Sequence, residues 1–375
     1  MSEQATEIFM KQMPVKLNGI PIRNLWYMLL YAWNEIVLKD HWDAEVEKSP
    51  SLDALLALIL RNLIKQRLRI GLGRSYMKED GLLRGIRGRM DFTESMNRLS
   101  FNNGQAYCHY QIFSHNAPKN QIIRSTLARL VQTGQFGEDQ IKVEEIRHML
   151  RQLVRDLDGI DLIEIKGDLI HRQQLSRNDG DYRMMLAICD LILKRQLPTE
   201  TIGSHKLPGL NRDALILYRI YERFVANFYK FHLVEWVVAP QARLSWHTKK
   251  TSKYMPTMSP DLVIQHRTSR RMVVLDTKFT ASSLIPNRWG NYVFDSSHLY
   301  QIYTYLRSQE HVSDSHRCAS GILLYPTVYE KVSETIELQG HQIQLATIDL
   351  SLPWDDIEDA LLDLVEAPKK ERKCN

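Results

Sequence analysis

The chain has 375 residues, of which 44% are hydrophobic and 25% charged, a composition that excludes a disordered or collagen-like protein. Lys and Arg number 49 against 44 Asp and Glu, a small excess that permits an anionic partner such as a nucleic acid without demanding one. No apolar run approaches the roughly 18 residues that cross a bilayer. The four scattered cysteines include no CxxC pair. We therefore expect no membrane contact, no structural zinc, no disulfide framework and a cytoplasmic location.

Hydrophobic periodicity predicts a first half that is largely helical. Residues 1–19 resemble a flexible leader, and residues 23–37 form a stretch with apolar side chains on every side, which is typical of a buried helix. Glycines punctuate residues 69–110, which indicates short strands and turns. Apolar residues recur at helical spacing in four further segments: 52–68, 120–132, 143–157 and 183–197.

The clearest domain boundary lies at residues 198–209, where Pro, Gly, Ser and Thr interrupt the apolar periodicity. An amphipathic helix follows from Ala214 to Phe228. We expect the domains to be a leader (1–19), an N-terminal domain (20–200), a second domain (208–366) and a basic tail (367–375). In the second domain, strands at 262–265, 272–279, 321–325 and 343–350 and a helix at 297–308 predict an α/β fold. In that fold a mixed N-terminal α+β domain precedes a central mixed sheet flanked by helices.

Two apolar strands around a short basic turn carry the residues with the clearest chemistry. Asp261 precedes the first strand, and Asp276 and Lys278 lie two positions apart in the second, so both project from one face. These charges among Val, Leu and Phe are costly unless compensated. A divalent cation on Asp261 and Asp276 would compensate them, and hard oxygen ligands favour Mg²⁺ over zinc. Lys278 could then orient a water or stabilise charge on a phosphate. The alternative is a solvent-facing edge strand in which Asp276 and Lys278 simply pair.

Two helices offer further polar residues to the same site. Glu222 lies at the rim of the apolar face of the first helix, where it either supplies a third carboxylate or pairs with a neighbouring arginine in solvent. In the second helix, Gln301 and Tyr305 are one turn apart, with His298 just before them. This pair either orients Lys278 or touches DNA, unless it is an ordinary surface pair.

The acidic helix, the Pro-Asp and Asp-x-Lys hairpin and the Gln-x-x-x-Tyr helix together resemble the PD-(D/E)xK nuclease superfamily. Further blocks narrow the resemblance to the McrC family, the nuclease subunits of McrBC-type modified-cytosine restriction systems. These blocks occur in the family's order and cover nearly the whole chain outside the leader and the tail: residues 20–33, 85–92, 120–127, 299–301 and 323–326.

The resemblance implies a Mg²⁺-dependent or Mn²⁺-dependent endonuclease subunit of a type IV, GTP-driven restriction complex active in phage defence. The complex would cleave double-stranded DNA that carries methylated cytosine. The N-terminal domain would dock on a hexameric McrB-like AAA+ GTPase and stimulate it, and nuclease domains would pair as a self-dimer. In this scheme Asp261 and Asp276 hold the metal with the backbone carbonyl of Thr277. Lys278 positions the attacking water, while Glu222 and Gln301 support the site.

Other features leave alternatives open. Arg84, Arg87 and Arg89 could contact an acidic rim of the partner or a phosphate, or could lie in a solvated hairpin. The chain contains no GxxxxGK[ST] loop, so we expect it to bind no nucleotide by itself. One alternative function is a non-catalytic activator or scaffold of the AAA+ motor that uses a nuclease-like fold for assembly. Another is a stand-alone nuclease that needs no nucleotide.

Overall fold

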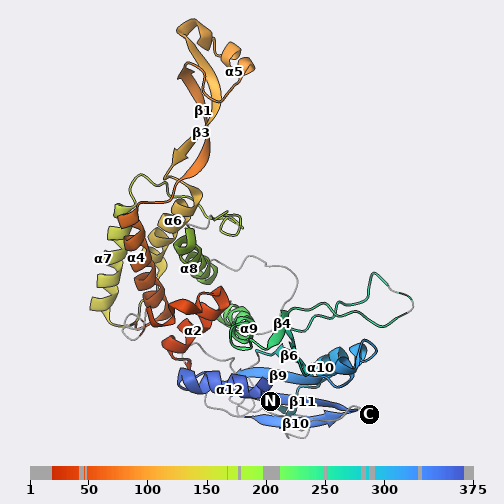
Figure 1. The fold of residues 1–375 in the computed structure, drawn as a ribbon. Coiled ribbons are helices and arrows are strands. Elements are labelled where there is room, and N and C mark those ends of the chain that lie inside the picture. The colour runs from red at the N-terminus through yellow and green to blue at the C-terminus, as the bar shows by residue number, and fades with distance from the viewer. Residues whose placement is uncertain are drawn as a thin grey trace, which may run out of the picture. The chain divides into compact units, whose positions relative to one another are not determined.

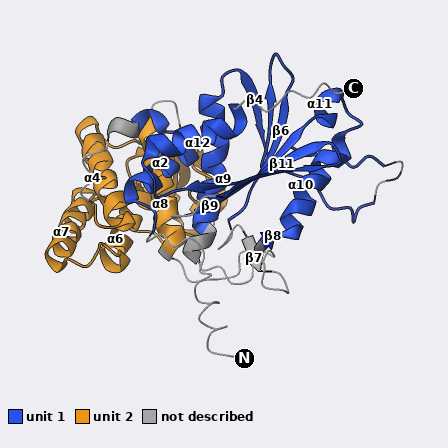
Figure 2. Cartoon of the chain, turned by 90° about the horizontal axis from the view of Figure 1, so that it is seen from below, with its two compact units in different colours: residues 1–43, 202–375 blue, residues 44–201 orange. Residues whose placement is uncertain are grey.

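The computed structural model describes residues 19–41, 46, 49–166, 168–175, 179–196, 212–248, 250, 252–279, 284–286, 292–327 and 332–366. The expected leader, apart from residue 19, and the basic tail lie outside these ranges. The chain divides into two compact units, one of residues 1–43 with 202–375 and the other of residues 44–201 (Figure 2). This division differs from the expected one, because residues 20–43 join the unit that holds the second domain.

The unit of residues 44–201 consists of a helical body and a β-arm that projects from it (Figure 1). The body packs α4 against α7 and α8, and α6 against α7 and α8. In the arm, β3 lies between β1 and β2 and is antiparallel to both. The elements of the body are α4 (Leu52–Ile70), α6 (Pro118–Thr133), α7 (Gln140–Asp156) and α8 (Gly180–Gln196). Those of the arm are β1 (Ser75–Arg84), β2 (Arg89–Met90), α5 (Phe92–Asn97), η3 (Ser100–Asn103) and β3 (Gln105–Ser114).

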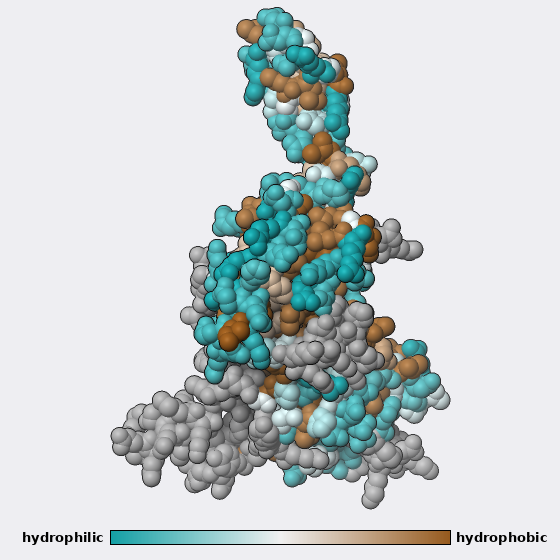
Figure 3. Space-filling model, turned by 90° about the vertical axis from the view of Figure 1, so that its left-hand side faces the viewer, coloured by the Kyte–Doolittle hydropathy of each residue, from teal (hydrophilic) through white to brown (hydrophobic). Residues whose placement is uncertain are grey.

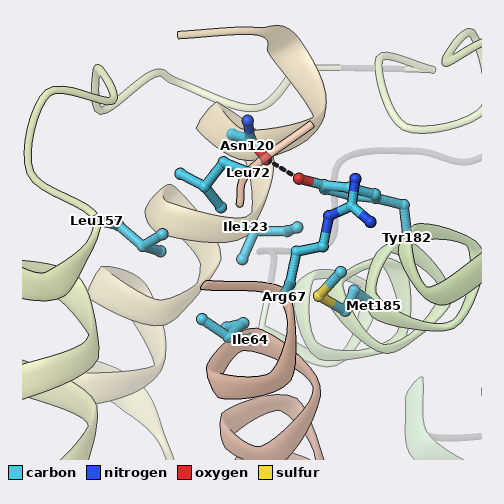
Figure 4. A pocket seen from close by; sticks show the side chains of 8 residues that line it. All are labelled: Ile64, Arg67, Leu72, Asn120, Ile123, Leu157, Tyr182 and Met185. Atoms are coloured by element: carbon cyan, nitrogen blue, oxygen red, sulfur yellow. Dashed lines mark hydrogen bonds between the residues drawn. The ribbon is translucent and has the colours of Figure 1, made fainter. Parts of the chain in front are cut away.

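A buried polar clamp fixes the root of the arm to α6 and α8. The Asn120 side-chain amide donates to the carbonyl of Gly73 at 2.9 Å and to that of His115 at 2.7 Å, so one side chain holds both ends of the arm. The Tyr182 hydroxyl donates to Asn120 Oδ1 at 2.6 Å and accepts from the Gly73 N–H at 2.9 Å. Figure 4 shows Tyr182 and Asn120 meeting beside a small cavity. Because these groups are buried, the clamp holds the arm's root in one position.

The other unit is built around a six-stranded mixed sheet in the order β10-β11-β9-β6-β5-β4. β6 runs parallel to β9 and antiparallel to β5. The predicted α/β fold is therefore confirmed, although β4, β10 and α12 were not predicted. The strands are β4 (Trp236–Pro240), β5 (Leu262–His266), β6 (Met272–Thr277), β9 (Ser320–Thr327), β10 (Ser333–Leu338) and β11 (His341–Asp349), with β7 (Leu284–Pro286) and β8 (Tyr292–Phe294) forming a separate pair. The helices are α2 (Ile22–Trp33), η2 (Ile36–His41), α9 (Arg212–His232), α10 (Ser296–Gln309), α11 (Asp314–Arg317) and α12 (Trp354–Glu366).

Helix α2 belongs to this unit because the unit covers its apolar surface. Residues 24–32 of α2 are all buried, and α2 packs along α9. The ring of Tyr31 stacks on that of Trp354 at a centroid distance of 5.8 Å. The Asn24 side-chain amide donates to the carbonyls of Leu350 and Leu352, both at 2.8 Å. Helix α2 therefore completes the hydrophobic core of the unit formed by residues 1–43 and 202–375.

The described residues also bear on the expected absence of membrane contact and of a disulfide framework. Within the described ranges, no helix is both long and apolar enough to cross a membrane. Cys108 and Cys189 are buried free thiols, and burial raises the pKa of Cys189 to about 12. Cys318 is disulfide-bonded, which the spacing of the cysteines did not predict.

Candidate active site

The β5–β6 hairpin holds Asp261 and Asp276 at the same end of the sheet. Leu262 pairs with Leu275 across the hairpin, and Asp261 Oδ2 accepts from the backbone N–H of Thr277 at 2.7 Å and from its hydroxyl at 2.5 Å. β6 lies between β5 and β9, and all of its residues are buried. Asp276 is only 3% exposed. The alternative of a solvent-facing edge strand is therefore wrong.

Lys278 follows β6 and is held by two contacts of its ammonium group. Its backbone N–H donates to the carbonyl of Leu324 at 2.9 Å, which extends the pairing with β9. Nζ forms an ion pair with Asp276 and donates to Gln301 Oε1 at 2.7 Å. The Gln301 amide in turn donates to the Tyr305 hydroxyl at 2.7 Å. Gln301 and Tyr305 on α10 are thus no ordinary surface pair, because they fix the position of the Lys278 ammonium.

Burial and mutual repulsion disfavour the charged forms of three carboxyls. Burial raises the pKa of Asp276 to about 6, with Lys278 opposing the rise and Asp261 adding to it. Burial also raises the pKa of Asp261, against the hydrogen bonds from Thr277 and the charge of Lys278. The pKa of Glu222 is raised by burial first and by Asp261 second. A cation bound near these carboxyls would favour their charged forms and so offset the effects of burial and repulsion.

Glu222 on α9 bonds Gln241 rather than a neighbouring arginine. Gln241 Nε2 donates to Glu222 Oε1 at 2.9 Å, and its backbone N–H donates to the carbonyl of Asp261 at 2.8 Å. Gln241 has a φ of 46°, a strained value for a non-glycine residue. Tyr218 lies one turn before Glu222, and its pKa is raised by burial and then by Asp261, Glu222 and Asp276. Neither residue was predicted for the site: helical spacing from Glu222 indicates Tyr218, but no sequence signal marks Gln241.

His298 lies beside Lys278 but bonds elsewhere. Its Nδ1 is 3.1 Å from the Tyr325 hydroxyl and its Nε2 is 3.9 Å from Asp295. Burial lowers its pKa, and the charge of Lys278 lowers it further. At neutral pH this ring is therefore uncharged, which suits a supporting position next to a cationic group.

The donor set fits a hard cation that keeps much of its water. Within the described residues, no group of three or more His, Cys, Asp or Glu side chains is arranged to hold a metal. Asp276 Oδ2 is buried and pairs with the charge of Lys278 without a regular hydrogen bond. Both bonds from Thr277 go to Oδ2 of Asp261, which leaves Oδ1 for another ligand. Mg²⁺ commonly binds through one or two carboxylates and several waters, so these residues fit it.

The three arginines of the arm belong to the other unit, that of residues 44–201, and all are exposed. Arg84 ends β1 and Arg89 begins β2. Arg87 lies over the ring of Tyr110 at 5.0 Å from its centroid and donates to the carbonyl of Gln111 at 3.3 Å. Large apolar side chains gather near the end of the arm (Figure 3): Ile86, Phe92, Met96, Leu99 and Phe101 are all at least 39% exposed. The part of the arm that carries the three arginines therefore exposes apolar side chains as well as charge.

The mixed sheet and the paired carboxylates at one end of it define an α/β protein with a site that fits a divalent cation. The chain is similar to a solved structure titled as a half-complex from the tetradecameric assembly of Thermococcus gammatolerans McrB AAA+ hexamers with bound McrC. That match has a TM-score of 0.50 and 14% identity, and it covers 92% of this chain and 76% of that chain. A sequence relative, the type IV methyl-directed restriction enzyme EcoKMcrBC of Escherichia coli (strain K12), is 27% identical over 353 residues, 92% of this chain and 97% of the relative. The model of the McrBC 5-methylcytosine restriction system component family matches residues 5–326. The chain therefore belongs to this family, which confirms the resemblance seen in the sequence.

Proposed function

We propose that this chain is the Mg²⁺-dependent endonuclease subunit of a GTP-driven restriction complex that cleaves DNA containing methylated cytosine. The observation that carries the proposal is the convergence of Asp261, Asp276 and Lys278. Thr277 bonds Asp261 across the hairpin, and Lys278 contacts Asp276. A non-catalytic scaffold would not need these charged groups at one site, so their convergence favours the nuclease over that alternative. The relative named as a type IV restriction enzyme supports the same function.

Each residue has a separate task in phosphodiester hydrolysis. Asp261 and Asp276 would hold Mg²⁺, together with the backbone carbonyl of Thr277. The bound ion would stabilise negative charge on the phosphate oxygens. Lys278, fixed by Gln301 at 2.7 Å, holds the attacking water and offers positive charge to the phosphate. Because Gln301 is itself bonded to Tyr305, the ammonium does not have to be ordered when the substrate arrives.

Glu222 completes the carboxylates around the site. Its pKa is raised by burial and by Asp261, so a nearby cation would favour its charged form. Gln241 fixes one of its oxygens at 2.9 Å. Glu222 would therefore support Asp261 and Asp276 by adding negative charge beside the bound cation.

The arm is the element that we propose docks on an AAA+ GTPase hexamer. It exposes arginines and apolar side chains together, and such a mixed surface is typical of a site that a protein partner covers. The structurally similar chain comes from an assembly of McrB AAA+ hexamers with bound McrC, which supports a partner of this class.

The test is to reconstitute the chain with its AAA+ partner, GTP, Mg²⁺ and DNA that contains methylated cytosine. Lys278→Ala and Asp276→Asn are each expected to lower the cleavage rate at least about 100-fold, with stimulation of the GTPase unchanged. Lys230→Ala, at an exposed residue on α9, is the matched control and should cleave as the wild type does. Undiminished cleavage by Lys278→Ala would show that the assignment is wrong.

A further inference from the structure

The connection between β4 and β5 forms a basic hairpin, residues 241–259, of which the structure describes 241–248, 250 and 252–259. Figure 1 draws it as a long projection next to β4. The sequence of the hairpin contains no Asp or Glu. Arg243, Lys250 and Lys253 are exposed cations within its described part. The hairpin is therefore a positively charged surface that carries no carboxylates of its own.

The hairpin is held by specific contacts rather than being a loose loop. The Leu244 N–H donates to the carbonyl of Met258 at 2.9 Å, and Trp246 Nε1 donates to that of Pro256 at 2.7 Å, so the two limbs are joined. On α10, Gln309 Nε2 donates to the carbonyl of Ser245 at 2.9 Å. Gln301, which bonds Lys278, lies on the same helix. Helix α10 therefore positions both the hairpin and the Lys278 ammonium.

Both ends of the hairpin lie at the candidate active site. Gln241, its first residue, bonds Glu222 through its side chain and the carbonyl of Asp261 through its backbone N–H. Ser259, its last residue, precedes Pro260 and Asp261. A molecule that contacts the base of the hairpin therefore also lies beside the carboxylates.

The exposed side chains suit a phosphate backbone. None of Arg243, Lys250 and Lys253 forms an ion pair with another described residue. Lys253 lies 4.9 Å from the ring centroid of Tyr254, which is 82% exposed. Unpaired cations bind phosphates by releasing counterions from the nucleic acid, and they do so without regard to sequence. The cores of protein–protein interfaces are depleted in lysine, so this lysine-containing cationic surface favours a nucleic acid over a protein partner.

We propose that the basic hairpin binds the phosphate backbone of duplex DNA next to the scissile bond and so positions the strand over Asp261 and Asp276. This inference rests on the proposed nuclease function, which it deepens by naming the element that holds the substrate. The hairpin cations orient the strand, whereas Lys278 acts on the reacting phosphate.

The test measures binding of the full chain to a fluorescent DNA duplex by anisotropy between 50 and 200 mM salt. Lys278→Ala is present in every protein so that Mg²⁺ can be included without cleavage. The hairpin variant adds Arg243→Gln, Lys250→Gln and Lys253→Gln. The matched control adds Lys230→Gln, Arg267→Gln and Arg270→Gln, three exposed cations. Arg267 and Arg270 lie in the turn between β5 and β6, at the end opposite the hairpin, and Lys230 lies in the last turn of α9.

The expected result follows from counterion release. Each phosphate contact changes the Kd about 3.5-fold over a fourfold change in salt, so three contacts account for about 40-fold. The salt dependence of the hairpin variant should be weaker than that of its parent by this factor, and the control should match the parent. Equal salt dependence in parent and hairpin variant, or an equal loss in the control, would overturn the proposal. Loss of binding to another protein with DNA binding intact would overturn it too, because the hairpin would then be a protein contact.

Because this assay measures binding without cleavage, it is independent of the nuclease test. If Lys278→Ala cut DNA normally, the proposed function would fail, while the salt dependence could still be measured in EDTA, where no Mg²⁺ supports cleavage. If the salt dependence were unchanged while Lys278→Ala abolished cutting, only the inference about the hairpin would fail.

Discussion

Replacing Asp276 by asparagine should stabilise the metal-free chain at pH 8 and remove its response to Mg²⁺. Burial raises the pKa of Asp276 from 3.8 to about 6, so between these values the folded chain keeps a proton that the unfolded chain releases. The free energy of unfolding therefore falls as pH rises through this window and stays low above it. At about 1.4 kcal/mol for each pH unit, the charged carboxylate destabilises the folded chain by about 3 kcal/mol. Asparagine carries no charge and avoids this penalty.

The assay is chemical unfolding at pH 5 and pH 8, in EDTA and with Mg²⁺. Relative to Asp276→Asn, the wild type should lose about 1–2 kcal/mol between pH 5 and pH 8 in EDTA, and it should regain stability when Mg²⁺ binds the folded state. Asp314→Asn is the matched control. Its carboxylate is exposed and lies 3.1 Å from Arg317, so the change should stay below about 1 kcal/mol. The reasoning fails if Asp276→Asn is less stable than the wild type at pH 8 in EDTA, or if Mg²⁺ stabilises both proteins equally.

Two further predictions concern the root of the arm and the first helix. A Cβ at Gly73 would lie 2.8 Å from Nζ of Lys119 and 3.0 Å from the ring of Tyr182, so Gly73→Ala should lower the free energy of unfolding by about 1–3 kcal/mol. Gly81→Ala meets open space and should change it by less than about 1 kcal/mol; equal effects in denaturant titrations would contradict a tight clamp. A fragment of residues 202–375 lacks α2 and should melt without cooperativity in near-UV circular dichroism until a segment of residues 19–41 is co-expressed. A cooperative melt of the fragment alone would contradict this role of α2.

Helices α4, α6 and α7 and the central strands could be predicted from the sequence because each kind of burial leaves its own apolar pattern. These helices are buried on one side, whereas the central strands are buried on both faces. In α4, α6 and α7 the apolar residues recur every three or four positions, and the same positions are buried in the structure. The continuous apolar runs of β6 and β9 became strands buried at every residue. β10 lies at the edge of the sheet and is mostly exposed, so its sequence carries no apolar run that would have indicated a strand.

The candidate site was partly readable for a similar reason. Period-two geometry places Asp276 and Lys278 on one face, and a hairpin brings the residue before its first strand to the end of its second, where Asp261 meets Thr277. The contacts of Gln241 and Tyr218 depend instead on how α9 lies against the end of β4. That placement is set by tertiary packing, and no local pattern encodes it.

Helix α2 shows how this limit affects domain boundaries. A helix that is apolar on every side predicts its own burial but not the surface that buries it, so sequence proximity assigned residues 20–43 to the N-terminal domain. In the structure Asn24 bonds the carbonyls of Leu350 and Leu352, and residues 44–201 are inserted between two parts of one compact unit. A truncation near residue 200 therefore removes part of the core of the unit that holds Asp261 and Asp276. Loss of cleavage in such a truncation would report on folding of that unit and not on docking to a partner.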